Sequence, residues 1–269
     1  MNKLLTILIL LFLTIFTTSC NDHKPTKIST AKKTDTISKT KLSSENSDIK
    51  IDGAKKVDIG YYEKYEKLPK LTFETITENE FLSLLPKKII DTLKLEQNNN
   101  FFYVKTTLKK HKFKKYRDYG GEESWSGYKY LGYYPTSKLF AIQENSTSDN
   151  LGFGQLFLLD NLNDYEYNII SFGDGAVEQP IPSVNNKYFV YFYNSVYEHK
   201  NCDIGVLKIN DKSNPKTYLN EYASYNSQDF AVEKIVWKSD NSFFVKGYEE
   251  VYENEEWVKK YKYYKTEFE

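Results

Sequence analysis

The chain has 269 residues, with 37 Lys and Arg against 37 Asp and Glu, so its formal net charge is +0. A balanced chain has no global field that steers it onto nucleic acid, and we expect no nucleic-acid partner. Arg117 is the sole arginine, which argues against a dedicated phosphate site, because bidentate phosphate recognition needs a guanidinium group. The 24 Tyr and 17 Phe have two interpretations, a ring-lined surface that stacks sugars or the codon bias of an AT-rich genome.

The first residues have the layout of a secretory signal. Lys3 supplies a positive start, residues 4–16 are almost continuously apolar, and the small Ser19 precedes Cys20. The junction resembles the lipobox of bacterial lipoproteins of the Bacteroidota type, although Thr17 replaces the usual aliphatic residue. The apolar run is shorter than the about 20 residues of a membrane-spanning helix. We therefore expect a signal peptide over 1–19.

The resemblance implies that Cys20 carries a diacylglyceryl group on its thiol and an acyl chain on its new amine. Two or three acyl chains make a stable membrane anchor. The expected location is the bacterial cell envelope, lipid-anchored at the outer membrane and facing the periplasm or the surface. The alternative is an ordinary secretory signal with an accidental cysteine.

Residues 20–58 are rich in Lys, Thr, Ser, Asn and Asp and show no lasting period. Low hydrophobicity with mixed charge is typical of disorder. As a coil this segment would span about 35 Å. We interpret it as a tether that precedes a β-rich globular domain over 59–269.

One helix is predicted near the start of that domain. Thr77 and Glu80 form a Thr-x-x-Glu capping box, and Pro86 ends or kinks the helix. Its apolar positions are Phe81, Leu84 and Leu85, and Ile89, Ile90 and Leu93 would extend the same face. We expect this short element to cover one end or face of a sheet.

The rest of the domain predicts strands, because segments rich in β-branched and aromatic residues alternate with turn residues. The expected strands are 101–104, 128–134, 139–143, 155–159, 165–171, 188–193, 204–209, 234–237, 243–248 and 258–264. The fold class is therefore all-β, mainly an antiparallel meander.

A weak internal repeat consists of a strand end, a polar turn and a hydrophobic strand. It occurs at 134–142, 182–191 and 236–245, and aligns Lys138, Lys187 and Ser242. The pattern resembles the blades of a β-propeller, although only about three units fit. Two architectures stay open, an irregular propeller-like array and a β-sandwich.

Three local groups of residues are candidates for catalysis or metal binding. His199 and Cys202 lack a third partner in the sequence, so we expect neither a nucleophile pair nor a zinc site. Residues 160–164 lack the Gly and distal Glu of a calcium loop and predict a hairpin turn. Gly173-Asp174-Gly175 predicts a turn. The alternative is that Asp174 and Glu178 are the paired carboxylates of a glycosidase. We predict no catalytic residue, no metal and no cofactor.

Residues 109–117 interleave lysines with aromatic residues. This pattern predicts either a docking patch for an anionic partner or a solvated edge strand whose lysines block edge-to-edge pairing. An acidic run over 249–256 either pairs with these lysines or solubilises another hairpin.

A dense aromatic stretch is the candidate ligand-binding segment. Its members are Trp125, Tyr128, Tyr130, Tyr133 and Tyr134. Because alternate strand residues point to opposite faces, Tyr128 and Tyr130 should share one face. Rings left exposed would suit sugar binding.

The leading hypothesis is a non-enzymatic, lipid-anchored envelope protein that presents a β-domain for binding or scaffolding. The first rival is a carbohydrate-binding or glycan-processing envelope lipoprotein. The second is an inhibitor or immunity-type protein that pairs with an exported enzyme.

Overall fold

The computed structural model describes residues 55–84, 90–117, 124–149, 151–195 and 198–269. The chain divides at Asp48/Ile49, and the described residues all belong to the second unit. Strands account for 57% of the described residues and helices for 7%, which confirms the all-β prediction. The signal, Cys20 and most of the expected tether lie outside the described residues.

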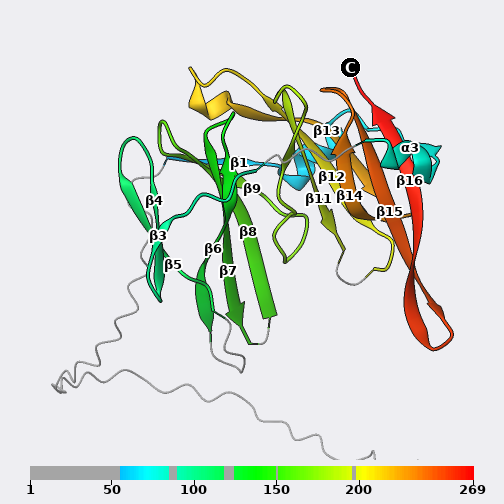
Figure 1. Ribbon diagram of the computed structural model, residues 1–269, viewed down its shortest axis with the longest axis horizontal. Helices are drawn as coiled ribbons and strands as arrows, with labels where there is room; N and C mark the ends of the chain where they lie inside the picture. The colour runs from blue at the N-terminus through cyan, green and yellow to red at the C-terminus, as the bar shows by residue number, and fades with distance from the viewer. Residues whose placement is uncertain (1–54, 85–89, 118–123, 150, 196–197) are drawn as a thin grey trace, which may run out of the picture. The chain divides into compact units, whose positions relative to one another are not determined.

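Four sheets make up the fold, and we name them A to D (Figure 1). Sheet D holds β3 (Glu96–Gln97), β4 (Phe101–Lys105) and β5 (Lys110–Lys114). Sheet A holds β6 (Trp125–Tyr134), β7 (Leu139–Ser148), β8 (Leu151–Asp160), β9 (Tyr165–Ile169) and β1 (Lys55–Ile59). Sheet B holds β10 (Ile181–Pro182), β11 (Tyr188–Asn194), β12 (Cys202–Ile209) and β13 (Leu219–Ser227). Sheet C holds β14 (Ala231–Trp237), β15 (Ser242–Glu253), β16 (Glu256–Glu267) and β2 (Glu74–Ile76).

The sheets pack face to face in the order D, A, B, C, and Figure 1 shows them side by side in this order. In β7, Phe140 and Ile142 face sheet D, whereas Leu139 and Ala141 face sheet B. A strand that is buried on both faces has a continuous run of apolar residues in its sequence. This explains the runs at 139–142, 188–192 and 243–245, where each successive residue enters the opposite core.

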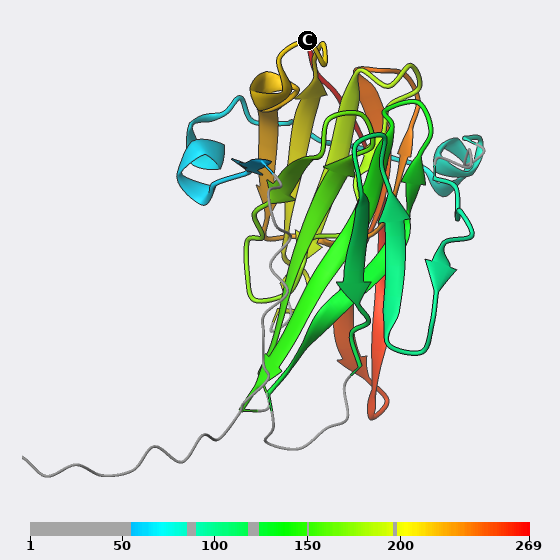
Figure 2. The same cartoon turned by 90° about the vertical axis from the view of Figure 1, so that its left-hand side faces the viewer.

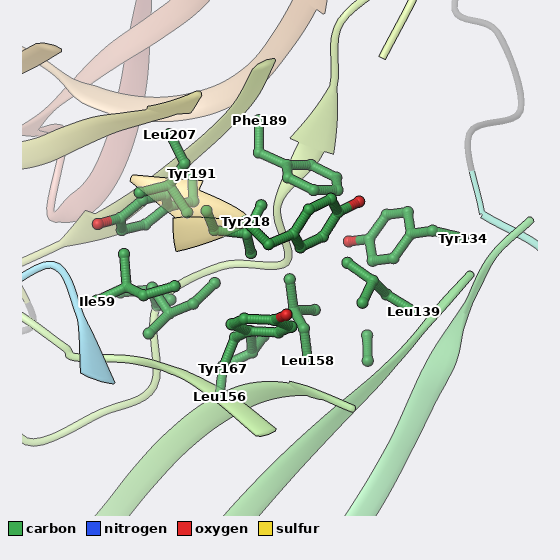
Figure 3. Close-up of a cluster of buried hydrophobic side chains, with 14 of the residues drawn as sticks. Ile59, Tyr134, Leu139, Leu156, Leu158, Tyr167, Phe189, Tyr191, Leu207 and Tyr218 are labelled. Atoms are coloured by element: carbon green, nitrogen blue, oxygen red, sulfur yellow. The ribbon is translucent and has the colours of Figure 1, made fainter. Parts of the chain in front are cut away.

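The A–B interface is the largest of these cores (Figure 3). Tyr134 packs against Phe189 from the opposite sheet, with ring centroids 5.2 Å apart. Tyr167 and Tyr218 meet in the same cluster at 5.6 Å. Much of the tyrosine content therefore fills the core between sheets, where large rings bury the most apolar area.

The described part of the chain forms several antiparallel sheets in a row without a closed barrel, which is nearer to the irregular propeller-like array than to a sandwich of two sheets. Sheets A, B and C are each built around successive antiparallel strands and lie in chain order, as propeller blades do. In the described part of the chain, two strands from the N-terminal region complete this array. β1 pairs in parallel with β9, and β2 pairs with the end of β16. The folded part thus includes Lys55–Asp58, residues that the sequence assigned to the tether.

The predicted capping box is present at the start of α3 (Glu78–Leu82). The Thr77 hydroxyl accepts from the Glu80 backbone N–H, and the Thr77 N–H donates to the Glu80 carboxylate. Phe81 packs with Val236 and Phe244 of sheet C, so the helix covers a sheet face as expected. The extension through Ile90 and Leu93 is wrong, because the helix ends at Leu82 and Asp91 bridges to Tyr133 of β6. A second helix, α2 (Tyr62–Lys67), and the 3-10 turn η1 (Pro215–Thr217) were not predicted.

Candidate functional site

Three corresponding turns lie at one junction of sheets A, B and C. Each joins the first strand of a meander to the second, at residues 135–138, 183–187 and 238–241. These are the three turns of the predicted internal repeat. Their side chains bond to one another, so the repeat builds a single shared surface.

The turns of sheets A and B are joined by side chains. The Ser137 hydroxyl, which is buried, donates to Asn186 Oδ1 at 2.8 Å. Lys138 and Asn186 both have left-handed backbones, with φ of 55° and 58°. Asn tolerates this conformation better than most residues. Lys138 thus corresponds to Asn186, one position before the Lys187 that the sequence aligned with it.

The turns of sheets B and C meet at one carboxylate. Asp240 Oδ1 accepts from the Ser183 hydroxyl at 2.8 Å and from the Asn185 backbone N–H at 2.7 Å. Asp240 Oδ2 accepts from Asn185 Nδ2 at 3.0 Å, and Lys187 Nζ lies 3.7 Å away. Burial acts to raise the pKa of Asp240, but the hydrogen bonds from Asn185 and Ser183 outweigh it and hold the pKa below its usual range.

A cleft of about 900 Å³ opens between these turns. Its lining comprises Ser83, Leu84, Tyr134, Pro135, Thr136, Ile181, Pro182, Ser183, Val184, Asn185, Asn186, Lys234, Ile235, Val236, Trp237 and Lys238. Ligand pockets in proteins fall in this size range. The described lining contains two lysines and amide groups but no carboxylate, so it suits a ligand with an apolar body and a negative or neutral polar end.

Hydrogen bonds and ring packing connect the walls of the cleft to the surrounding fold. Trp237 Nε1 donates to the Ile181 carbonyl at 2.9 Å, and its ring packs edge-on against Phe243 at 5.0 Å. The buried Tyr134 hydroxyl donates to the Pro180 carbonyl. Val184, in contrast, is 42% exposed and stands at the cleft without being part of the core. The site is therefore preformed, with an accessible side chain at hand for testing it.

The aromatic stretch of β6 is mostly internal. Tyr128 and Tyr130 pack with the D–A cluster, so they share a face as predicted. A β-bulge between Tyr130 and Gly132 shifts the register, and Tyr133 enters the same cluster. Tyr133 is 9% and Tyr134 1% exposed, so neither presents a ring face to solvent. Trp125 is half-buried. The five aromatic residues of this segment therefore do not form an exposed platform of rings.

Part of the stretch does line a second groove, of about 670 Å³, between sheets D and A. Tyr128 and Tyr130 form one wall, and Tyr116, Phe102 and Leu95 contribute to the rest. The sequence pointed to the first two residues of this groove. It did not point to the others, because only the pairing of sheets D and A brings them together.

His199 and Cys202 lie in different surroundings. The His199 ring stacks on Trp257 at 4.0 Å, and its Nδ1 lies 3.1 Å from a Glu250 carboxylate oxygen. Cys202 is 1% exposed and belongs to the B–C core. Burial raises the pKa of its thiol, which keeps the reactive thiolate scarce.

The expected hairpin turn at 160–164 is present between β8 and β9. Asp160 is fully buried, accepting from Leu162 N–H at 2.8 Å and Lys212 Nζ at 2.6 Å. Asp164 lies 3.0 Å from His111 Nε2 in a second buried pair. Both carboxylates are thus engaged by protein groups. Among the described residues no cluster of three or more metal-ligating side chains occurs.

The segment with Gly173 and Gly175 is a turn, as expected. A side chain at Gly173 would collide with the Tyr193 ring, whose hydroxyl lies 2.4 Å from the position of a Cβ. The Asp174 carbonyl accepts from Gly154 N–H at 2.9 Å. These contacts explain the glycine by close packing, without any role for a carboxylate pair with Glu178.

The chain matches no protein-family model, and it matches neither a curated protein nor a solved structure. In the described part, no helix has the length and apolar character needed to cross a bilayer.

Proposed function

We propose that this chain is an exported, lipid-anchored envelope protein that binds a ligand in the cleft between the three turns. The single observation that supports binding is the cleft itself, about 900 Å³ in volume and framed by turns that hydrogen bond to one another. A preformed site avoids the ordering cost that a flexible loop would pay on binding.

The ligand class follows from the lining. Pro135, Ile181 and Trp237 supply apolar contact, and Lys234 and Lys238 supply positive charge at the same cleft. An amphipathic molecule or a peptide with an acidic end fits this combination. A cationic ligand would meet like charge without a compensating carboxylate among the described lining residues.

The anchor rests on the sequence around Cys20 and is tested separately. In cells, the parent is expected in the outer-membrane fraction and a Cys20→Ser variant in the soluble envelope fraction. A Ser19→Thr variant serves as the control because it keeps the cysteine. Identical fractionation of Cys20→Ser and the parent would remove the anchor from the proposal without affecting the cleft.

The ligand is sought by placing a photo-crosslinking residue at position 184, with position 258 as control. Val184 and Val258 are equally exposed, at 42%, but only Val184 lines the cleft. We expect an adduct in intact envelopes from position 184 alone. A discrete protein adduct would assign an inhibitor-type partner, and a small mass increase would assign a lipid or glycan. Equal adducts from both positions would count against the cleft.

A glycan is the second candidate, favoured by the tyrosine-lined groove between sheets D and A. The half-buried Tyr128 and Tyr130 line this groove together with Lys129. Binding on a glycan array that is weakened by Tyr130→Ala and unchanged by Val184→Trp would place sugar in this groove. An array without binding, or binding that Trp125→Ala and Tyr130→Ala leave intact, removes this candidate.

A further inference from the structure

The outer face of sheet D concentrates lysines. Sheet D lies at one end of the row of sheets, and its strands face the viewer in Figure 2. The inward residues of β4 and β5 are Phe102, Val104, His111 and Phe113, which are buried. The outward positions carry Lys105, Lys110, Lys112 and Lys114, all exposed. The strict alternation of β5 thus gives one apolar face and one cationic face.

These lysines are placed against each other. Lys105 lies directly across from Lys110 in the ladder, and like charges in opposed positions destabilise a sheet. Among these four lysines, and within the described residues, only Lys110 forms an ion pair with a carboxylate, with its Nζ 2.7 Å from Glu96 Oε1. Lys112 instead lies over the Phe101 ring at 3.9 Å. Stability of the sheet alone does not account for this arrangement.

Edge protection accounts for only part of it, because Lys110, Lys112 and Lys114 lie on the edge strand β5 but Lys105 does not. Lysines that prevent edge-to-edge pairing belong on the outermost strand. Lys105 lies on β4, the middle strand of the described sheet. In addition, Lys115, directly after β5, bridges to Tyr128 of β6, so this end of the edge is already occupied.

The acidic run near the C-terminus does not neutralise this face. Two of its carboxylates pair with lysines of their own hairpin, Glu249 with Lys262 at 3.2 Å and Glu253 with Lys260, and Glu250 lies 3.1 Å from His199 Nδ1. None of these three contacts reaches sheet D. Among the described residues, the acidic run therefore does not account for the lysines of the cationic face.

Exposed apolar residues adjoin the cationic face. A groove of about 730 Å³ is lined by Leu93, Leu108, Tyr103, the lysines at 94, 105, 109 and 110, and one acidic residue, Glu96, which pairs with Lys110. Leu108 is 65% and Leu93 40% exposed. Lysines that surround exposed leucines and a tyrosine are typical of surfaces that lie at the headgroup level of a membrane.

We propose that the outer face of sheet D docks onto an anionic lipid surface. The face spreads separate ammonium groups over a sheet, which matches many headgroup phosphates better than a single bound phosphate, because lysine acts as a point charge without the guanidinium fork. Leu108, at the turn between β4 and β5, reaches the apolar boundary. The inference goes beyond the ligand cleft, which is formed by the other three sheets.

The test uses the mature chain with Cys20→Ser, so that no acyl chain contributes. It is sedimented with phosphatidylcholine vesicles, with and without phosphatidylglycerol. We expect binding only to the anionic vesicles. The triple variant Lys105→Glu, Lys112→Glu, Lys114→Glu should bind at least about tenfold more weakly. A control with the same charge change at the exposed Lys67, Lys200 and Lys216 should bind like the parent.

Equal losses in the two triple variants would overturn the proposal, because net charge alone would then govern binding. Circular dichroism confirms that each variant is folded before it is compared. Leu108→Ser is expected to reduce vesicle binding several-fold at high salt and to leave binding to soluble heparin unchanged. Binding to heparin without binding to anionic vesicles would assign a soluble polyanion and contradict the lipid surface.

Discussion

The carboxylate of Asp240 holds the turn of Asn185, with the backbone N–H of Asn185 2.7 Å and its side-chain amide 3.0 Å from the two Asp240 oxygens. The two residues belong to turns of different sheets, 55 positions apart. This contact joins sheets B and C at the point where the cleft opens. The geometry of the candidate site therefore depends on a side-chain bond between sheets as well as on the sheets themselves.

Replacing Asp240 with Ala should lower the free energy of unfolding by about 1–2 kcal/mol, since it removes several hydrogen bonds to a charged group at a partly accessible site. Urea unfolding followed by fluorescence measures the change. Asp174→Ala is the control, because Asp174 is an exposed turn residue. A midpoint that shifts equally in both variants would show that the contact adds nothing to stability.

The same carboxylate gives an acid dependence. The pKa of Asp240 is below its ordinary value in the folded state, so its stabilising contribution is present above the unfolded-state pKa, near 3.9, and disappears as the pH falls through the folded-state pKa. Between about pH 4 and lower values, the unfolding free energy of the parent should fall more steeply than that of Asp240→Asn. Parallel curves for the two proteins would contradict the assignment.

Glu166 should act in the opposite sense. It is 2% exposed, with Oε1 2.7 Å from Lys56 Nζ, and burial raises its pKa despite that partner. The folded state thus favours the protonated carboxyl, and this contribution is lost as the pH rises through the raised pKa. Above about pH 4.3, Glu166→Gln should show a flatter decline of stability than the parent. The exposed Glu178→Gln is the control, and a parent-like slope for Glu166→Gln would refute the prediction.

Cys202 should be inert in the native protein. Its thiol is buried and its pKa is raised, so iodoacetamide should label it at least about a hundredfold more slowly than in urea. In the Cys20→Ser background it is the only cysteine. Mass spectrometry follows the labelling over time. Fast native labelling that is abolished by His199→Ala would instead establish an activated Cys–His pair.

Much of the architecture could be predicted from local pattern. The capping box of α3 and the runs at 139–142 and 188–192 were readable because capping residues and apolar runs report local geometry. The strands β1 and β2 were not readable. Their residues are mostly exposed, and they are strands only because β9 and β16 offer edges to pair with.

The candidate site was only partly predictable. The repeated turns were visible in the sequence, but their mutual hydrogen bonds depend on how sheets A, B and C stack. The exposure of the β6 aromatics was not predictable, because a bulge at Tyr130–Gly132 changes which rings share a face. Alternation along a strand holds only while the register is regular.

Native mass spectrometry of the protein released from envelopes tests the cleft most directly. The parent should retain a non-covalent adduct, Val184→Trp should lose it because the larger indole obstructs part of the cleft, and Val258→Trp should keep it. A parent without an adduct, or a Val184→Trp variant that retains the same mass, would contradict the assignment of the cleft as the binding site.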